Sequence, residues 1–236
     1  MMRWLHLRFE APLASFGGEA IDARGVIRDF PAQSMLTGLL ANALGWTRSM
    51  RADHQRFQSR ILFGAVHDDD PALRRMTDYQ TAQLRKADKM WSTRGAPIGR
   101  AGGANTYLGA HQRWRDYHAD LRLSVVLTLA PEAPEPSLEH VAAALDKPAR
   151  PLFIGRKSCL PTTPILRGWL EAGDVRAALE SVVPAGRECP AIWPHSDGMG
   201  GDHAAMVTDE RNWMSGLHGG ARKVCLGRLT GSGRAQ

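Results

Sequence analysis

The residues with the clearest chemical character form one short loop, bounded by prolines, in the second half of the chain. An apolar run, Leu152–Ile154, is followed by Gly155, which permits a tight turn, and then by Arg156, Lys157 and Ser158. Two cations, a hydroxyl and free backbone N–H groups in one turn match the anionic oxygens of a phosphodiester. The loop is not a nucleotide P-loop, because the pattern G-x-x-x-x-G-K-[ST] is missing. A phosphodiester site and a basic surface turn are the two interpretations of this loop.

A second candidate for anion binding lies at an expected helix start. Apolar residues recur with helical spacing over Leu36–Leu44, and Gly45 is expected to end the helix. Ser34 is the expected N-cap. Arg24 and Arg28 lie just upstream, and the N-terminal end of a helix attracts anions. The pattern predicts an anion site here, although the same helix would also pack on a sheet.

Residues 80–118 differ in character from the rest of the chain. They contain seven Lys or Arg and two Asp, an excess of five positive charges out of a net charge of +6 for the whole chain. Five glycines and four aromatic residues are interleaved with these cations, and there is no steady apolar period. Such a segment cannot bury a core of its own, so we expect it to project as an arm or β-hairpin. Cations with interleaved aromatic rings are typical of single-stranded nucleic-acid binding. A flexible basic insertion is the alternative.

The composition narrows the class of protein. A chain of 236 residues can form one large domain or two small ones, and the excess of 30 Lys and Arg over 24 Asp and Glu favours a polyanionic partner. Three cysteines without a C-x-x-C pair indicate neither a disulfide framework nor a zinc site. Asp68–Asp70 precede a proline, as in a solvated turn, so we expect no metal or cofactor. The sequence shows no signal-peptide pattern and no membrane-spanning run, and we expect a cytoplasmic protein.

Strand signals and helical stripes alternate along the remaining residues. The expected elements are strand 4–9, helices 34–44 and 51–60, strands 61–66, 73–79 and 121–129, helices 137–145 and 174–182, and short strands at 191–193, 205–208 and 223–226. This order fits an α+β fold of the ferredoxin-like or RNA-recognition-motif type, β-α-β-β-α-β. Residues 1–79 and 119–236 would form a discontinuous body, with residues 80–118 inserted into it. The open face of such a sheet can bind RNA.

Three stretches together resemble one known family. Arg8–Gly17 is similar to its opening strand and turn, Phe30–Gly45 to its first-helix signature F-P-T-x-S-x-L-x-G-L-L-x-x-x-L-G, and Pro151–Pro164 to its Y-L-G-R-[KR]-S-C loop. Thr77–Thr81 and Trp114–Tyr117 look like the borders of its inserted thumb. The family is CasD, a subunit of the type I-E CRISPR surveillance complex Cascade. The resemblance covers roughly residues 3–170, and the chain departs from the family pattern at Ala32, where threonine is usual, and at Phe153–Ile154, where Tyr-Leu is frequent.

The resemblance implies a specific role. Members of this family are RNA-recognition-motif palms with a protruding thumb, here residues 80–118, that hold the 5′ handle of the CRISPR RNA (crRNA). They cap the helical row of CasC backbone subunits and contact the large subunit CasA, which gives them an indirect role at target DNA and none at a membrane. The residues expected to bind RNA are Arg24, Arg28, Gln33, Ser34, Arg85, Lys86, Trp91, Arg94, Arg100, Arg113, Gly155, Arg156, Lys157 and Ser158.

A catalytic role is the alternative. The type I-C counterpart of this family is a metal-independent endoribonuclease that cleaves precursor crRNA with tyrosine, lysine and histidine. Tyr79, Lys157 and either His111 or His118 could supply those groups, since such cleavage needs a base and a cation for the oxyanion. The motifs match the type I-E branch, in which CasE cuts the RNA, so we expect a non-catalytic holder. A DNA-binding or purely structural adaptor would show no preference for handle RNA.

Overall fold

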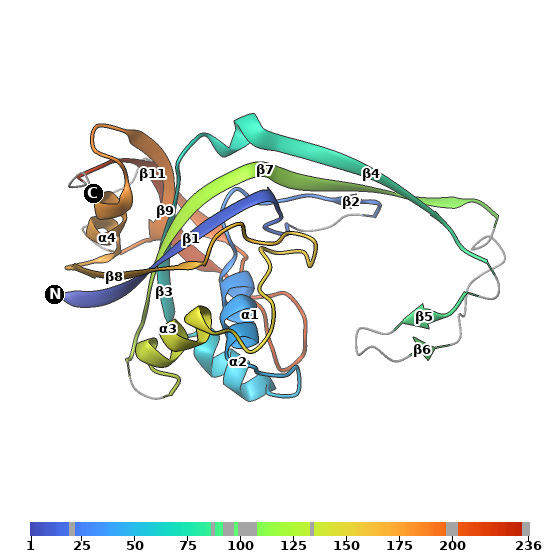
Figure 1. Ribbon diagram of the computed structural model, residues 1–236, viewed down its shortest axis with the longest axis horizontal. Helices are drawn as coiled ribbons and strands as arrows, with labels where there is room; N and C mark the ends of the chain where they lie inside the picture. The colour runs from blue at the N-terminus through green and yellow to red at the C-terminus, as the bar shows by residue number, and fades with distance from the viewer. Residues whose placement is uncertain are drawn as a thin grey trace.

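One large sheet carries most of the chain (Figure 1). The computed structural model describes residues 1–18, 22–85, 88–91, 97–98, 108–132, 135–196 and 203–232. The helices are α1 (Gln33–Ala43), α2 (Arg51–Gln58), α3 (Leu138–Asp146), α4 (Val175–Val182) and a 3-10 helix, η1 (Pro71–Arg74). The strands are β1 (Met2–Ala14), β2 (Arg24–Gly25), β3 (Ile61–His67), β4 (Arg75–Gln83), β5 (Met90–Trp91), β6 (Pro97–Ile98), β7 (Ala110–Leu129), β8 (Leu166–Ala172), β9 (Glu188–Pro194), β10 (His203–Val207) and β11 (Arg222–Thr230).

The main sheet is predominantly antiparallel and is covered on both faces. Its strands follow the order β10-β11-β9-β3-β7-β1-β8, while β2 and β4 also pair with β7. Among the strand pairs of the described residues, β2–β7 alone is parallel. In Figure 1, α1, α2 and α3 gather on one side of the sheet, and α4 lies beside β9 and β11. The result is a mixed α/β fold with one large antiparallel sheet.

Two apolar cores follow from the alternation of side chains along the strands. Leu5, Leu7 and Phe9 of β1 point to one face and pack with α1 and α3. Trp4, on the opposite face of the same strand, packs with the apolar side of α4. Burial of both faces therefore fixes the strand register, because a slip of one residue would move the side chains of each face to the opposite face of the sheet.

Strand β7 joins the body of the protein to a projecting ribbon. Its second half pairs with β1 and β3, from Leu121 to Leu129, and contributes apolar residues to both cores. Its first half pairs with β4, in a continuous register from Arg75↔His118 to Gln83↔Ala110. At about 3.3 Å per residue, the 20 residues of β7 span roughly 65 Å, so the first half extends well beyond the body (Figure 1).

The start of α1 differs from the expectation. The N-cap is Ala32, without a side-chain cap, so Ser34 lies inside the first turn and the prediction that it caps the helix is wrong. Instead, the Gln33 N–H donates to Asp209 Oδ2 at 3.2 Å, and the Ser34 N–H donates to Asp209 O at 3.0 Å. An internal carboxylate thus takes the place predicted for an external anion. The apolar stripe of α1 and its termination at Gly45, with φ +79°, are confirmed.

Other element boundaries also differ from those expected from the sequence. The strand expected at residues 73–79 is wrong at its beginning, because Asp70 caps η1 by accepting from the Ala72 N–H at 2.9 Å, and β4 starts only at Arg75. The ribbon therefore begins before residue 80. Strand β8, at the edge of the sheet, was not expected beyond Leu166, although its side chains alternate. None of the helices in the described ranges is long and apolar enough to cross a membrane.

Candidate nucleic-acid interface

The basic loop after Leu152 is held against the end of β1. Gly155 has φ +90°, and a Cβ built on it would lie 1.7 Å from Ser15 O, so glycine is required there. The Ser15 N–H donates to Ile154 O at 3.1 Å, and the Ile154 N–H donates to Cys159 O at 2.7 Å. Burial raises the pKa of the Cys159 thiol, which keeps it protonated and unreactive. The sequence-predicted turn is thus a fixed loop with its cations at the outer end.

Arg156 connects this loop to the foot of the ribbon. Its guanidinium lies over the ring of Tyr117 in β7, with Cζ 4.4 Å from the ring centroid. Its Nη2 donates a long hydrogen bond, 3.4 Å, to Gly25 O in β2. Lys157 and Ser158, the next two residues, are exposed. The loop therefore presents one oriented guanidinium and two exposed side chains at the junction of body and ribbon.

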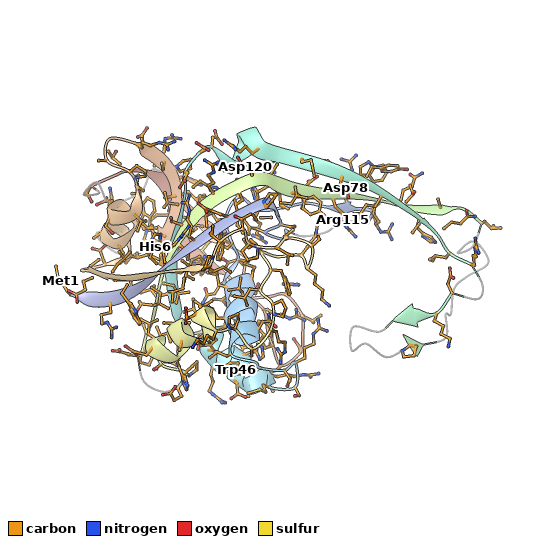
Figure 2. The ribbon with its side chains drawn as sticks, in the orientation of Figure 1. Met1, His6, Trp46, Asp78, Arg115 and Asp120 are labelled. Carbon is orange, nitrogen blue, oxygen red and sulfur yellow. The ribbon has the colours of Figure 1, made fainter. Side chains whose placement is uncertain are left out.

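A groove of about 1020 Å³ runs from this junction along α1, and we call it the α1 groove. Its described lining contains no Asp or Glu. The charged and aromatic side chains that line it are Trp46, Arg48, Arg51, His54, Arg150, Phe153, Arg156, Arg211, Trp213 and His218. Five arginines in a lining that has no described Asp or Glu make the groove electropositive. Trp46, one of the lining residues, lies far from Arg115 and the ribbon in Figure 2.

The groove arginines are held by backbone carbonyls. Arg150 donates to Trp46 O at 2.8 Å and to Gly45 O at 2.7 Å, at the C-terminal end of α1. Arg51 donates to Met214 O at 3.1 Å, and Arg211 donates to the carbonyl of Gly216 at 2.8 Å. Within the described ranges none of these three, nor Arg156, forms an ion pair with a carboxylate. Carbonyls fix the guanidinium positions without neutralising the charge, so the attraction for an anion is retained.

Three buried polar atoms in the lining have no hydrogen-bond partner among the described residues. They are Ser15 Oγ, Arg156 Nη1 and Arg211 Nε. Buried polar groups are almost always hydrogen-bonded, and an unsatisfied donor on a cation is especially costly. All three can donate, and phosphate oxygens are acceptors only. These atoms are enclosed by the protein, so it is the arginines lining the groove that give it the charge for a nucleic-acid backbone.

The C-terminal part of the chain builds one wall of the groove, which the sequence did not indicate. Gln58 of α2 donates to Arg211 O at 3.0 Å and accepts from Trp213 Nε1 at 2.9 Å. Asp209 accepts from Arg222 Nη2 at 2.8 Å while it caps α1. The contacts of Gln58 with Arg211 and Trp213, and of Asp209 with the start of α1, join residues more than 150 positions apart. The only signal in the sequence was a cluster of Gly, His and Trp in this part.

The ribbon has two chemically different faces. Tyr79 lies opposite Trp114 in the β4–β7 register, and Arg24 lies beside Trp114 in the β2–β7 pair, so these three side chains share one face. Arg115 and Tyr117 alternate to the other face, where Arg156 lies. Figure 2 labels Arg115 on β7 and its β4 neighbour Asp78. The α1 groove therefore meets only the Arg115 face.

The residues that were predicted to bind RNA fall into two groups, those engaged inside the protein and those accessible at its surface. Gln33 is 6% exposed and donates its side-chain amide to Gln58 O at 2.7 Å, so it holds two helices together and we leave it out of the interface. The backbone N–H of Ser34 is taken by Asp209, although its side chain lines the α1 groove. Arg28 donates to Thr208 O at 2.9 Å. The remaining described positions at the loop and the ribbon are exposed or half-buried: Arg24, Arg85, Arg113, Gly155, Arg156, Lys157 and Ser158.

Four of the predicted thumb positions lie partly or wholly outside the described residues. They are Lys86, Arg94, Arg100 and the side chain of Trp91. Arg113, within the described ribbon, is exposed and donates to Gln112 O at 2.8 Å. The RNA contacts predicted for these positions stay predictions.

The residues considered for RNA cleavage are not assembled into one site. Tyr79 and His111 lie on opposite faces of the ribbon, as their β4–β7 register requires. His118 is buried and lies 2.9 Å from Arg28 O, which places its proton on Nε2. Tyr79 pairs with residue 114, so His118 lies four residues further along β7, roughly 13 Å away. Proton transfer needs hydrogen-bond distance, and no such arrangement exists among these side chains.

Comparisons with known proteins agree with one another. The family described as CRISPR-associated protein (Cas_Cas5) matches residues 4–225. A curated relative, CRISPR system Cascade subunit CasD of Escherichia coli (strain K12), is 31% identical over 193 residues, which are 79% of this chain and 80% of that protein. Two solved structures share the fold. A chain of a CRISPR RNA-guided surveillance complex matches with a TM-score of 0.71 at 20% identity, over 97% of this chain and 90% of that chain. A crystal structure of a Cas protein matches with a TM-score of 0.60 at 23% identity, over 96% and 95%.

Proposed function

Because this chain belongs to the Cas5 family of CRISPR-associated proteins, we propose that it is a non-catalytic subunit of a type I-E Cascade complex that holds the 5′ handle of the crRNA. In such machines base pairing reads the target sequence, while the proteins hold the guide through its backbone and shape. The relative from Escherichia coli is described as a Cascade subunit, which supports the assembly part of this proposal.

The observation that carries the RNA-binding part is the α1 groove. It combines five arginines, no described carboxylate and three buried donors without partners. An anionic chain in the groove would meet guanidinium groups, and charge-assisted hydrogen bonds from guanidinium to phosphate are among the strongest in proteins. A phosphodiester backbone has the required charge at each residue, and the groove follows α1, which at 1.5 Å per residue is about 16 Å long. That length accommodates two or three nucleotides.

The sheet supports a ferredoxin-like palm. The strand order β3-β7-β1-β8, with α1 between β1 and β3 and α3 between β7 and β8, follows the β-α-β-β-α-β sequence of elements. The β4–β7 ribbon would be the thumb, passing over the RNA and against the neighbouring CasC subunit. CasA is the second protein partner in this proposal, and target DNA is reached only through the assembled complex.

Direct binding measurements test the proposal. Fluorescence anisotropy would compare repeat-derived RNA with a scrambled strand of equal length at several salt concentrations. We expect tighter binding of the repeat RNA, and Arg156→Ala or Lys157→Ala should weaken it by roughly 1–3 kcal/mol, about five- to 150-fold. Arg56→Ala is the matched control: it removes the same charge from an exposed residue of α2 that is ion-paired with Asp53 and does not line the groove.

Two results would contradict the proposal. Equal loss of affinity in the Arg156 and Arg56 variants would show that only net charge attracts the RNA. Metal-independent cleavage of the repeat RNA by the pure protein would show that the chain is an endoribonuclease rather than a holder. The binding and the cleavage measurements use the same buffer, which contains a chelator and no divalent metal ion.

A further inference from the structure

The face of the ribbon that points away from Arg156 carries an exposed aromatic side chain with a built support. The ring of Tyr79 is 5.2 Å from that of Trp114, measured between centroids, and tilted by 44° to it. The Arg24 guanidinium lies over the Trp114 ring at 5.7 Å. Across β2, β7 and β4 the order is therefore Arg24, Trp114 and Tyr79. The outermost of these side chains, Tyr79, is 51% exposed.

We propose that Tyr79 is the stacking platform for one unpaired base of the same RNA strand whose backbone the α1 groove holds. This inference rests on the proposed function and adds a subsite on the opposite face of the ribbon. Stacking on a tyrosine suits any base, because every base has a π-face, and a neighbouring arginine adds attraction for the phosphates on either side. Trp114 and Arg24 hold the platform, and Tyr79 makes the contact.

The two faces are close enough for one strand to reach both. Arg24 and Gly25 are successive residues of β2, so their side-chain directions point to opposite faces of the ribbon. The Gly25 carbonyl accepts from Arg156, at the mouth of the α1 groove, while Arg24 supports the ring stack. Strand β2 pairs only with β7 among the described strands. RNA that leaves the groove at Arg156 can thus turn around β2 and arrive at Tyr79.

Beside the ring pair one cation and one carboxylate balance each other, so the exposed ring is the feature of this face that suits a base. The one carboxylate that the β4–β7 register places beside the ring pair, Asp116, accepts a hydrogen bond from Thr77 Oγ1 at 2.7 Å. The cation Arg24 is exposed. A cross-strand aromatic pair also stabilises a ribbon by itself, but that role does not require an outer ring that is half exposed. A protein partner on the same face is a distinct outcome of the test below.

Photo-crosslinking in the full-length protein tests the subsite. Uridines of the repeat-derived RNA would be replaced one at a time by 5-iodouridine, irradiated in the complex and mapped after trypsin digestion. Cleavage after Arg75 and Arg85 releases residues 76–85, in which Tyr79 is the sole aromatic residue. We expect one RNA position to crosslink to this peptide. Tyr79→Ala should weaken binding by roughly five- to 150-fold, whereas Tyr79→Phe, which keeps the ring, should bind nearly as well as the wild type.

Thr81→Ala is the matched control, because it lies on the same face and strand without a ring. If Tyr79→Ala binds RNA like this control and all crosslinks map to the α1 groove, the stacking subsite is refuted while the proposed function stands. If Tyr79→Ala leaves RNA affinity unchanged and impairs assembly with the other Cascade subunits, the face binds protein and the inference is wrong. If the wild type shows no preference for repeat RNA, the proposed function itself fails.

Discussion

Replacing Gly155 by alanine should detach the basic loop from β1. The added Cβ would lie 1.7 Å from Ser15 O, about half of a normal contact distance, and the residue has φ +90°. The positive φ costs about 1–3 kcal/mol. Relief of the overlap must separate the two backbones, which breaks the hydrogen bond from the Ser15 N–H to Ile154 O, and a changed φ at residue 155 disrupts the bond within the loop from the Ile154 N–H to Cys159 O, each contributing about 1 kcal/mol. The free energy of unfolding should fall by about 3–5 kcal/mol.

Urea and thermal unfolding measure this change. A loss of this size corresponds to a Tm decrease of about 6–20 °C for a chain of this length. Gly17→Ala is the matched control in the same region, because a Cβ there meets nothing within 4 Å, and its stability should stay near that of the wild type. RNA affinity of Gly155→Ala, measured well below its Tm, should also fall, since Arg156 moves with the loop. A variant within 1 kcal/mol of the wild type would refute the claim that the loop is fixed by this approach.

Two further predictions concern buried ionisable groups. Asp209→Ala should lower the free energy of unfolding by about 3–5 kcal/mol, because it leaves the Arg222 guanidinium, 14% exposed, without its carboxylate and removes the cap of α1. His67 is 3% exposed, and burial lowers its pKa to about 4. The unfolded chain binds a proton near pH 6.5, so the stability that neutral His67 contributes is complete above that pH and is lost as the pH falls towards 4, by about 2 kcal/mol between pH 7 and pH 5.

Each of these has a control in the same protein. Asp53→Ala removes an exposed ion pair on α2 and should change the free energy of unfolding by less than 1 kcal/mol, so a similar effect at Asp209 would contradict the capping argument. His67→Gln keeps a side-chain N–H for Asp29 O, the partner of His67 Nε2 at 2.6 Å, but cannot titrate. Its stability should therefore depend less on pH between 7 and 5 than that of the wild type. Identical slopes in urea denaturation series would show that His67 is not the group responsible.

Patterns among neighbouring residues correctly predicted those helices, caps and strands that neighbouring residues themselves determine. The apolar spacing of α1 and its end at Gly45, the N-cap Ser137 of α3 and the strand over residues 121–129, the second half of β7, could be read directly from neighbouring residues. The charge excess of residues 80–118 indicated a segment without a core of its own, and the described part of that segment is a polar ribbon. Asp68–Asp70 were read as a solvated turn, whereas Asp68 is ion-paired with Arg8 and Asp70 caps η1.

The sequence by itself determined which residues are cationic, which loop needs a glycine and which segments alternate, because those properties depend on a residue and its near neighbours. The tertiary structure decided which cations stay without a carboxylate. Asp209 reaches α1 from far along the chain and takes the helix start that had been expected to bind an anion, and Arg222 accompanies it. Arg211 and Arg150 reach the groove from separate segments, and each donates to a backbone carbonyl rather than to a described carboxylate. Ion pairing depends on distance in space. Residues that are far apart in the sequence come within that distance only when the sheet folds and buries its two apolar cores.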